Sequence, residues 1–308
     1  MTTLSNMIDE VSMNLSGYTL QQDRATYITA AVTTTTSPSS APTILTLASA
    51  DNLGKGVVEI DEELLWIDNF DRVGNTATIA PYGRGYLGTT AATHAADAKV
   101  TISPTFPRFA IKRAINDTIS AIGSSIFTAN TTTITSNAAV AAFRLPATGT
   151  TLNIRSILAV AYQALGASKE WIPIRTYRFD GNANSTAFTS GQTISIYDNI
   201  PSGRTIQVVY SADPVPFTTN ADVFTTQTGL PESCKDLVIL GATYRLLSNL
   251  DPARASMISP QADEVDAKRP YGSSQSITKQ IYALFNQRLN EEIKKQQDKY
   301  PIRVHYSL

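Results

Sequence analysis

The stretch that most constrains the fold is residues 107–127, PRFAIKRAINDTISAIGSSIF. Its isoleucines recur at intervals of three and four, which places them on one face of an α-helix. Pro107 suits the first turn, where a missing N–H costs nothing, and Asn130 with the threonines after it ends the pattern. The sequence therefore predicts an amphipathic helix that buries one stripe against other elements: Ile111, Ile115, Ile119, Ile122 and Ile126.

Two more stripes predict helices at the beginning of the chain and after Pro231. The first is stopped by Ser16-Gly17, and the second by Asp251-Pro252. Gly241 on the second stripe would allow another backbone to approach closely. The members of the first stripe are Leu4, Ile8, Val11 and Leu15, and those of the second are Leu237, Leu240, Gly241, Tyr244 and Leu247.

A last helix is predicted over residues 273–300, before Pro301 breaks it. Its apolar stripe implies packing against the other helices, while four charged residues near its end are expected to face water. The stripe is Ile277, Ile281, Phe285, Leu289 and Ile293, and the charged residues are Glu291, Glu292, Lys294 and Lys295.

Between the first two helices the pattern changes to short β-type runs. Residues 24–28 could begin a strand, residues 33–42 are a polar linker, and residues 43–102 contain alternating runs separated by turn residues. Residues 71–75 are predicted as a hairpin turn, and residues 99–102 as the closing strand. This passage is expected to form a small antiparallel barrel or sandwich.

A second β-passage covers residues 129–224, with turn signals at GNANS, PSG and ATGT. Their regular spacing predicts a β-sandwich. The segment NIRSILAVAYQA resembles a helix by composition, but we favour a strand because Asn153, Arg155 and Ser156 lead into a β-branched run.

These patterns together predict an α+β fold, a small helical frame with two inserted antiparallel β-lobes. The predicted boundaries are as follows: residues 1–28, 106–128 and 229–300 for the helical frame, 29–105 for the barrel or sandwich lobe, 129–228 for the β-sandwich lobe, and 301–308 for a C-terminal docking tail.

The charge balance argues against dedicated nucleic-acid binding. The chain has 25 basic and 26 acidic residues and a formal net charge of −1, so the usual basic surplus is missing. Cys234 is the only cysteine, which excludes an intrachain disulfide. The N-terminus lacks the pattern of a signal peptide, and no apolar run approaches the ~20 residues of a membrane span. We expect a soluble protein made in a reducing compartment, without a membrane partner.

The sequence contains few residues that could form a catalytic site. The two histidines, His94 and His305, lie in an alanine-rich turn and a terminal tail, and we expect a structural role for His94. Cys234 in a first helical turn could have a lowered pKa, but a half-buried structural thiol is the simpler interpretation. We therefore expect no enzyme, no catalytic residue and no cofactor.

Metal, nucleotide and sugar sites are each weighed against a structural alternative. Glu59, Asp61, Glu62, Glu63 and Asp68 form a carboxylate cluster without the spacing of a Ca²⁺ loop, and a turn between strands explains Asp61 to Glu63 equally well. GRGYLG at residues 83–88 is not a dinucleotide fingerprint. The scattered Tyr and Phe residues of the second passage could bind sugar, but core packing explains them too. We expect no metal site.

One segment is similar to a motif in structural proteins of tailed phages, an acidic hairpin followed by RGYxGTTAAxHxxGAxV. Asp97 and Ala98 stand where a Gly-Ala pair is more usual. The loop residues that carry the motif are Arg84, Gly85, Tyr86, Gly88, Thr89, Thr90 and His94, and the other matching positions are Glu63, Trp66, Ala91, Ala92 and Val100. The helical layout in turn resembles head-to-tail adaptor (connector, or head-completion) proteins, although the large second β-lobe is a departure.

The resemblance implies a structural virion protein of the neck, assembled in the host cytoplasm. In such a protein a homo-oligomeric ring of about twelve copies, as the portals of the family have, sits under the portal protein. It joins the DNA-filled capsid to the tail and continues the channel, through which genome DNA passes without sequence-specific binding. Its other partner is a tail-side connector, stopper or tail terminator protein.

The segment after Pro301 alternates apolar and polar residues, the pattern of a strand with one apolar face. A terminal strand can add to a sheet edge of another chain. In the adaptors that this chain resembles, the C-terminal extension reaches the portal, which implies a docking interface of Ile302, Arg303, Val304, His305, Tyr306 and Leu308. The alternative is that this tail folds back as an edge strand on the chain's own β-lobe.

Two other functions remain open at this point. One is a tail-tip or baseplate protein whose β-lobes bind glycans, and the other is a cell-wall hydrolase.

Overall fold

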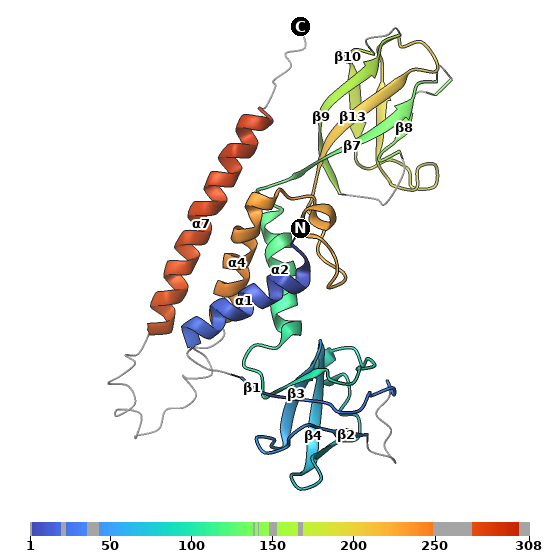
Figure 1. The fold of residues 1–308 in the computed structure, drawn as a ribbon. Helices are drawn as coiled ribbons and strands as arrows, with labels where there is room; N and C mark the ends of the chain where they lie inside the picture. The colour runs from blue at the N-terminus through green and yellow to red at the C-terminus, as the bar shows by residue number, and fades with distance from the viewer. Residues whose placement is uncertain are drawn as a thin grey trace. The chain divides into compact units, whose positions relative to one another are not determined.

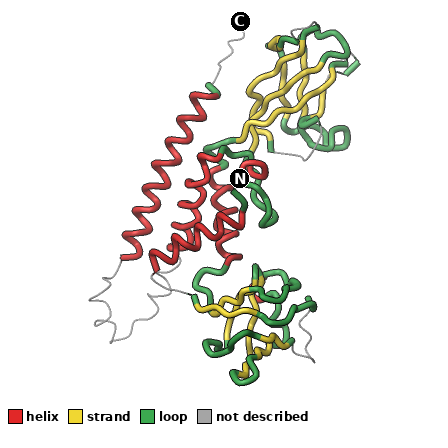
Figure 2. Tube along the Cα trace, in the orientation of Figure 1, coloured by secondary structure: helices red, strands yellow, loops and turns green. Residues whose placement is uncertain are grey.

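The structure is a computed structural model, and it describes residues 2–19, 23–35, 43–137, 139–140, 142–147, 153–165, 169–248 and 273–301. Helices and antiparallel strands are segregated along the chain (Figure 2), which confirms the predicted α+β class. The predicted linker over residues 33–42 is described only as far as residue 35, and the tail of residues 302–308 lies outside the described residues.

The chain forms two compact units. Unit 1 comprises residues 1–4, 116–238 and 283–308, and unit 2 comprises residues 5–115 and 239–282. The division falls within helices, so the three-part boundaries predicted from the sequence stay a prediction. Each unit has its own β-sheet core and is described by itself below.

Unit 2 contains a six-stranded antiparallel sheet in the order β1-β6-β3-β4-β5-β2, which curls into a partial barrel (Figure 1). The edge strands β1 and β2 continue into a bridge between Ile28 and Leu47, where Thr29 donates to the carbonyl of Thr46 at 2.8 Å. The strands are β1 (Arg24–Tyr27), β2 (Ile44–Thr46), β3 (Gly56–Ile60), β4 (Glu63–Asp71), β5 (Thr76–Ile79) and β6 (Lys99–Ile102).

The strands of the barrel form because apolar and polar residues alternate along them and because suitable residues stand in the turns. Residues at every second position fill its core, among them Val58, Ile60, Leu65 and Ile67. The β4–β5 turn lies where the sequence predicts it, and the β3–β4 turn has Asp61 in the left-handed region, with φ 56°. Aspartate and asparagine tolerate that region better than most residues. The predicted strands of the first β-passage are thus confirmed.

Unit 2 also holds most of α1 (Leu4–Thr19) and the first half of α2 (Arg108–Ile122). The predicted stripe of α1 is buried, but its predicted end is wrong, because the helix continues through Gly17. A helical glycine costs about 1 kcal/mol, which does not end a helix whose apolar face is already buried. The Arg108 guanidinium pairs with Asp9 of α1 at 2.5 Å.

Unit 1 contains a β-sandwich of two antiparallel sheets, one in the order β10-β9-β13-β7 and one in the order β11-β12-β8 (Figure 1). The segment predicted as a strand despite its helical composition is β9, which pairs with β13. The strands are β7 (Thr128–Thr135), β8 (Ala142–Arg144), β9 (Ile154–Gln163), β10 (Trp171–Pro173), β11 (Tyr177–Asp180), β12 (Thr193–Ile196) and β13 (Thr205–Ala212).

The helical part of unit 1 begins with the second half of α2. This helix ends at Ile122, earlier than predicted, although Ile126 beyond it is buried as expected. At Gly123 a Cβ atom would lie 3.1 Å from Pro214 Cδ, so glycine allows the close approach that ends the helix. Unit 1 also contains α3 (Phe224–Thr228), which the sequence did not predict, and η2 (Glu232–Cys234). It includes α4 (Lys235–Ser248) as far as Val238 and α7 (Ser273–Lys299) from Ala283 onward, and the rest of both helices belongs to unit 2.

The buried face of α4 is broader than the predicted stripe. Leu240 and Tyr244 are only half-buried, whereas Val238, Ile239 and Ala242, outside the stripe, are buried. A helix that is apolar over most of its circumference cannot be reduced to one face from sequence alone.

Candidate functional site

The loop between β5 and β6 in unit 2, which carries the phage-type motif, is held by a buried ion pair. Glu63, the first residue of β4, receives the Arg84 guanidinium in a two-pronged contact, with Nε–Oε1 at 2.7 Å and Nη2–Oε2 at 2.8 Å. The two side chains are 0% and 1% exposed. Two parallel bonds between planar groups fix the orientation of Arg84 as well as its position.

Backbone groups complete the shell around this pair. The amides of Gly85 and Ala92 donate to the Glu63 carboxylate at 2.9 and 3.0 Å. Arg84 also donates to the carbonyls of Thr34 and Ala92, at 2.6 and 2.5 Å. One carboxylate therefore holds two points within the loop, Gly85 and Ala92, against β4.

His94 joins the cluster through both ring nitrogens. Nε2 lies 2.9 Å from the Glu63 carboxylate and Nδ1 lies 2.7 Å from Asp61. Burial alone would lower the pKa of His94, but the two carboxylates raise it above its usual value, which favours the imidazolium. These contacts fit the expected structural role of His94 and show which carboxylates it contacts, which the sequence did not provide.

The carboxyl of Glu63 is correspondingly acidic. Burial would raise its pKa, yet the hydrogen bonds from Arg84, His94 and the amides of Ala92 and Gly85 lower it to about 2. The Glu63 carboxylate is therefore ionised at neutral pH, and its hydrogen bonds meet the condition under which a buried ion pair can be tolerated.

This fixed loop presents large apolar side chains to solvent. Leu87, in η1 (Tyr86–Gly88), is 69% exposed, and Tyr82 is 77% exposed. Both have a left-handed backbone, with φ 55° and 57°, which is costly for side chains of this size. The Tyr86 ring packs against Trp66 at 5.2 Å between centroids. The loop is thus a rigid apolar projection from the barrel.

The predicted motif residues differ in burial and form three groups. Arg84, Thr89 and His94 are buried in the anchor, where the Thr89 hydroxyl accepts from the amide of Leu64 at 3.0 Å. Thr90 and Gly88 are exposed, and Gly85 and Tyr86 are half-buried. The structure brings Arg84, Gly85 and His94 together around Glu63. A role of the loop in binding stays a prediction.

The remaining acidic residues of the predicted carboxylate cluster are each engaged locally. Glu59 accepts from the amide of Arg108 at 2.5 Å, Glu62 pairs with Lys112 at 3.1 Å, and Asp68 lies 3.9 Å from Lys55. In the part of the chain that the structure describes, no group of His, Cys, Asp and Glu is arranged to hold a metal ion.

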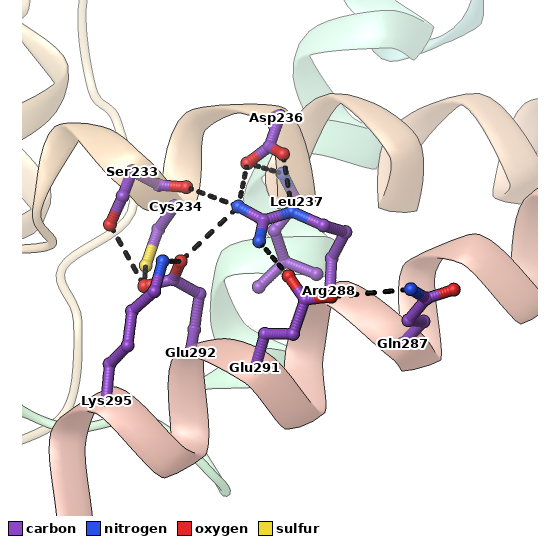
Figure 3. Close-up of polar contacts among 9 residues, drawn as sticks. All are labelled: Ser233, Cys234, Asp236, Leu237, Gln287, Arg288, Glu291, Glu292 and Lys295. Atoms are coloured by element: carbon purple, nitrogen blue, oxygen red, sulfur yellow. Dashed lines mark hydrogen bonds and ion pairs between the residues drawn. The ribbon is translucent and has the colours of Figure 1, made fainter. Parts of the chain in front are cut away.

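Unit 1 has a second polar cluster, which links η2 and the start of α4 to α7 (Figure 3). Arg288 of α7 donates to Asp236 at 2.7 Å and to Glu292 at 3.3 Å, and it also pairs with Glu291. Lys295 pairs with Glu292 at 2.6 Å. This cluster fixes the register of α7 against α4.

Glu292 corrects a prediction, because it does not face water. It is 4% exposed and receives the Ser233 hydroxyl at 2.9 Å. The sequence did contain a sign that Glu292 is paired with cations. Arg288 and Lys295 lie four residues before it and three residues after it, and residues at these spacings share a helix face. The Cys234 thiol is also buried beside Glu292; burial, and then the carboxylate, raise its pKa to about 12. The thiol thus fits the structural interpretation preferred from the sequence, although it is buried and not half-buried.

Aromatic residues of the second lobe pack in its core. Tyr210 is 3% exposed, and Tyr162, Tyr177 and Phe179 pack against the same cluster. The core interpretation is thus confirmed for these residues. His305 and the predicted docking residues 302–308 lie outside the described residues.

The sequence model of the SU10 adaptor protein family matches residues 87–305, more than two thirds of the chain. The chain therefore belongs to the SU10 adaptor family of phage structural proteins, a virion component. The predicted resemblance to phage head-to-tail adaptors is confirmed. No curated protein matches the chain. None of the described helices is long and apolar enough to cross a membrane.

Proposed function

We propose that this adaptor forms a ring under the portal of a tailed phage, joins the DNA-filled capsid to the tail and continues the DNA channel. The observation that carries the proposal is the family match over residues 87–305. Because portals of such phages are twelve-fold, about twelve copies are expected. A ring arises when one surface of each copy binds a different surface of the next.

The charge of the chain supports a channel that DNA crosses without being held. A net charge of −1 gives little attraction for phosphates, so DNA would slide without sequence-specific contacts. The partners in this proposal are the portal protein and, on the tail side, a connector, stopper or tail terminator protein. The protein works in the neck of the virion and assembles in the host cytoplasm.

We assign portal docking to residues 302–308, whose alternating pattern suits addition to a sheet edge of another chain. The anchored loop with Leu87 is a candidate for contact between copies, since an exposed apolar side chain on a fixed backbone loses little conformational freedom on binding.

Negative-stain electron microscopy of the full chain, alone and mixed with its portal, tests this proposal. The expected result is rings that are seated on portals, with a copy number measured by mass photometry. A chain that stays monomeric and does not associate with the portal would exclude a ring under the portal. Attachment at the far end of the tail would instead support a tail-tip protein.

A further inference from the structure

Strand β7 is a long and unprotected edge of the sandwich in unit 1. It stands last in the sheet order β10-β9-β13-β7, so among the described strands it pairs only with β13. Its sequence TANTTTIT contains no charge and no proline, and its eight residues pair with β13 without a bulge. Charges, prolines, bulges and short length are the features that normally keep a sheet edge from pairing with another chain.

The other three described edge strands of the sandwich carry such features. β8 and β11 each include an arginine, Arg144 and Arg178. Just after β10, the amide of Ile174 donates to the carbonyl of Val160 in β9 at 2.9 Å, so the odd-numbered residues of β10 face the open edge. Pro173 is one of these residues and has no N–H to offer there. Among the described edges of the sandwich, β7 is thus the exception.

The open backbone groups of β7 can be identified from its ladder. Just after the strand, the Ser136 amide donates to the carbonyl of Arg204 at 2.7 Å, toward the start of β13. Alternate residues of an antiparallel strand turn both backbone groups to the same neighbour. Residues 129, 131, 133 and 135 therefore turn their N–H and C=O groups away from β13. No hydrogen bond joins those groups to another described residue.

Phe127 shows how the same edge is covered directly before the strand. As an odd-numbered residue it turns its backbone groups the same way as the four open residues. There the Gln296 side chain of α7 accepts from its amide at 3.1 Å and donates to its carbonyl at 2.5 Å. The carboxamide thus takes the place of a neighbouring strand. In the described part of the chain this cover ends at Phe127, and the edge along β7 is left open.

The open edge of β7 is complementary to itself. If a second β7 lies antiparallel to the first about Thr132, residue 129 meets residue 135 of the other copy and residue 131 meets residue 133. All four open residues of each strand then form hydrogen-bonded pairs. Thr131 and Thr133, whose side chains are exposed, lie opposite each other on the outer face. Threonine pairs across strands are favourable, and an uncharged strand does not repel its own copy.

We propose that β7 is a pairing surface for a second copy of this chain, and that two copies join antiparallel along β7 into one continuous sheet. The occupant is a second copy because the exposed side chains of β7 are Ala129 and three threonines, which would not select an unlike partner. The strand matches its own copy at every open residue. This contact relates two copies by a twofold axis, so it does not build the ring of the proposed function and stands independently of it.

Charge-swapped variants of the full chain test the pairing. Thr131→Lys with Thr133→Lys puts lysine opposite lysine, and Thr131→Glu with Thr133→Glu puts glutamate opposite glutamate. In sedimentation velocity over a range of protein concentrations, each variant should raise the dissociation constant of the dimer at least about tenfold. An equal mixture of the two variants, in which every lysine faces a glutamate, should return it to within about threefold of the parent value.

Gln207→Lys is the matched control for added charge. Gln207 of β13 is paired with Thr133 and lies on the same face, one strand away from the edge. No residue of the second copy would lie directly opposite it, so this variant should change the dissociation constant less than about threefold.

Residue-resolved hydrogen exchange by NMR locates the contact. The amides of Thr131, Thr133 and Thr135 are the probes, and they should exchange at least about tenfold more slowly once the protein concentration exceeds the dissociation constant. The amides of Thr132 and Ile134, which face β13, should be protected at every concentration. The lysine variant should lose the first effect and keep the second, which shows that it is folded.

A chain that stays monomeric, with rapidly exchanging probes, would overturn the proposal. Protection of the probes that does not depend on concentration would mean that another part of the same chain covers the edge, and it would overturn the proposal too. A dimer that both charged variants still form has its contact elsewhere, with the same consequence. Failure of the mixed variants to dimerise would likewise exclude pairing along β7. Seating of rings on the portal tests the proposed function alone.

Discussion

The clusters around Glu63 and Glu292 place a buried carboxylate among cations in two different ways. The partner of Glu63 is itself buried, since the Arg84 side chain is 1% exposed. The partners of Glu292 reach water, with the side chains of Arg288 and Lys295 26% and 60% exposed. A buried partner has no water to return to when the pair is broken, whereas an exposed one is rehydrated. The first arrangement fixes a loop, and the second adjusts how two helices pack.

The largest expected effect is therefore that of Glu63→Gln, which leaves the Arg84 guanidinium buried without its counter-charge. We expect a loss of about 3–5 kcal/mol in the free energy of unfolding of the barrel. Urea denaturation followed by Trp66 fluorescence in a Trp171→Phe background measures it, because the chain's two tryptophans lie in different β-lobes.

Removing both partners provides the matched control. Glu63→Gln combined with Arg84→Met should cost less than Glu63→Gln alone, because no buried charge is left unpaired. If the double variant is the less stable of the two, the ion pair is not the reason for the loss.

The next largest effect is the loss of stability of the barrel at acid pH. The folded pKa of Glu63 is lowered to about 2 from an ordinary value near 4.5, so its stabilisation is present above pH 4.5 and is lost as the pH falls toward 2. The loss should approach about 3 kcal/mol over that range. Urea midpoints of the barrel at several pH values check it. Glu63→Gln should flatten this part of the profile, and an unchanged slope would assign the acid response to other carboxyls.

The sequence predicted the elements better than the clusters. The stripe Ile111, Ile115, Ile119 and the alternation in β4 depend on periods of 3.6 and 2, which are local and readable. The bond between Glu63 and Arg84 joins residues 21 positions apart, and no local period encodes it. The resemblance to phage proteins pointed to Arg84 and His94 but did not say what these residues do. The structure shows that both bind the Glu63 carboxylate and so hold the loop.

Glu292 shows why the side-chain clusters could not be predicted from the sequence. Four charged residues within five positions near the end of a helix are typical of a solvated face. Lys294 and Lys295 are indeed exposed, and the Glu291 side chain is 44% exposed. Only the tertiary position of Ser233 and Cys234 buries Glu292. The exposed Leu87 is a similar case, because its left-handed backbone lies between Gly85 and Ala92, which both contact the distant Glu63.

Glu59 is a third buried carboxylate that can be compared with Glu63 and Glu292. Unlike them, it accepts from a backbone amide, that of Arg108, and not from the side chain of a cation. Burial raises its pKa to about 7, although the amides of Arg108 and Phe109 and the charge of Arg108 oppose the shift and Asp23 adds to it. Because the folded pKa is raised, its contribution to stability is present below pH 4.5 and is lost as the pH rises to about 7.

Glu59→Gln should therefore stabilise unit 2 by about 2 kcal/mol more at pH 8 than at pH 4.5, since the amide stays neutral. Urea midpoints at the two pH values measure the difference. Glu62→Gln is the control, and it should show a smaller change between them. A Glu59→Gln variant that is less stable than the parent at pH 8 would mean that the amides at the start of α2 need the negative charge.

The smallest effect is expected for Glu292→Gln. Arg288 keeps Asp236 and Glu291, Lys295 is hydrated, and the new amide can still accept from the Ser233 hydroxyl. We expect a loss of about 1 kcal/mol, measured by urea denaturation followed by helical ellipticity at 222 nm. Glu291→Gln, one residue away and more exposed, should cost less than about 0.5 kcal/mol. A loss for Glu292→Gln as large as that for Glu63→Gln would show that hydration of the partners does not separate the two clusters. It would then be the burial of the carboxylate, common to both, that sets the energy.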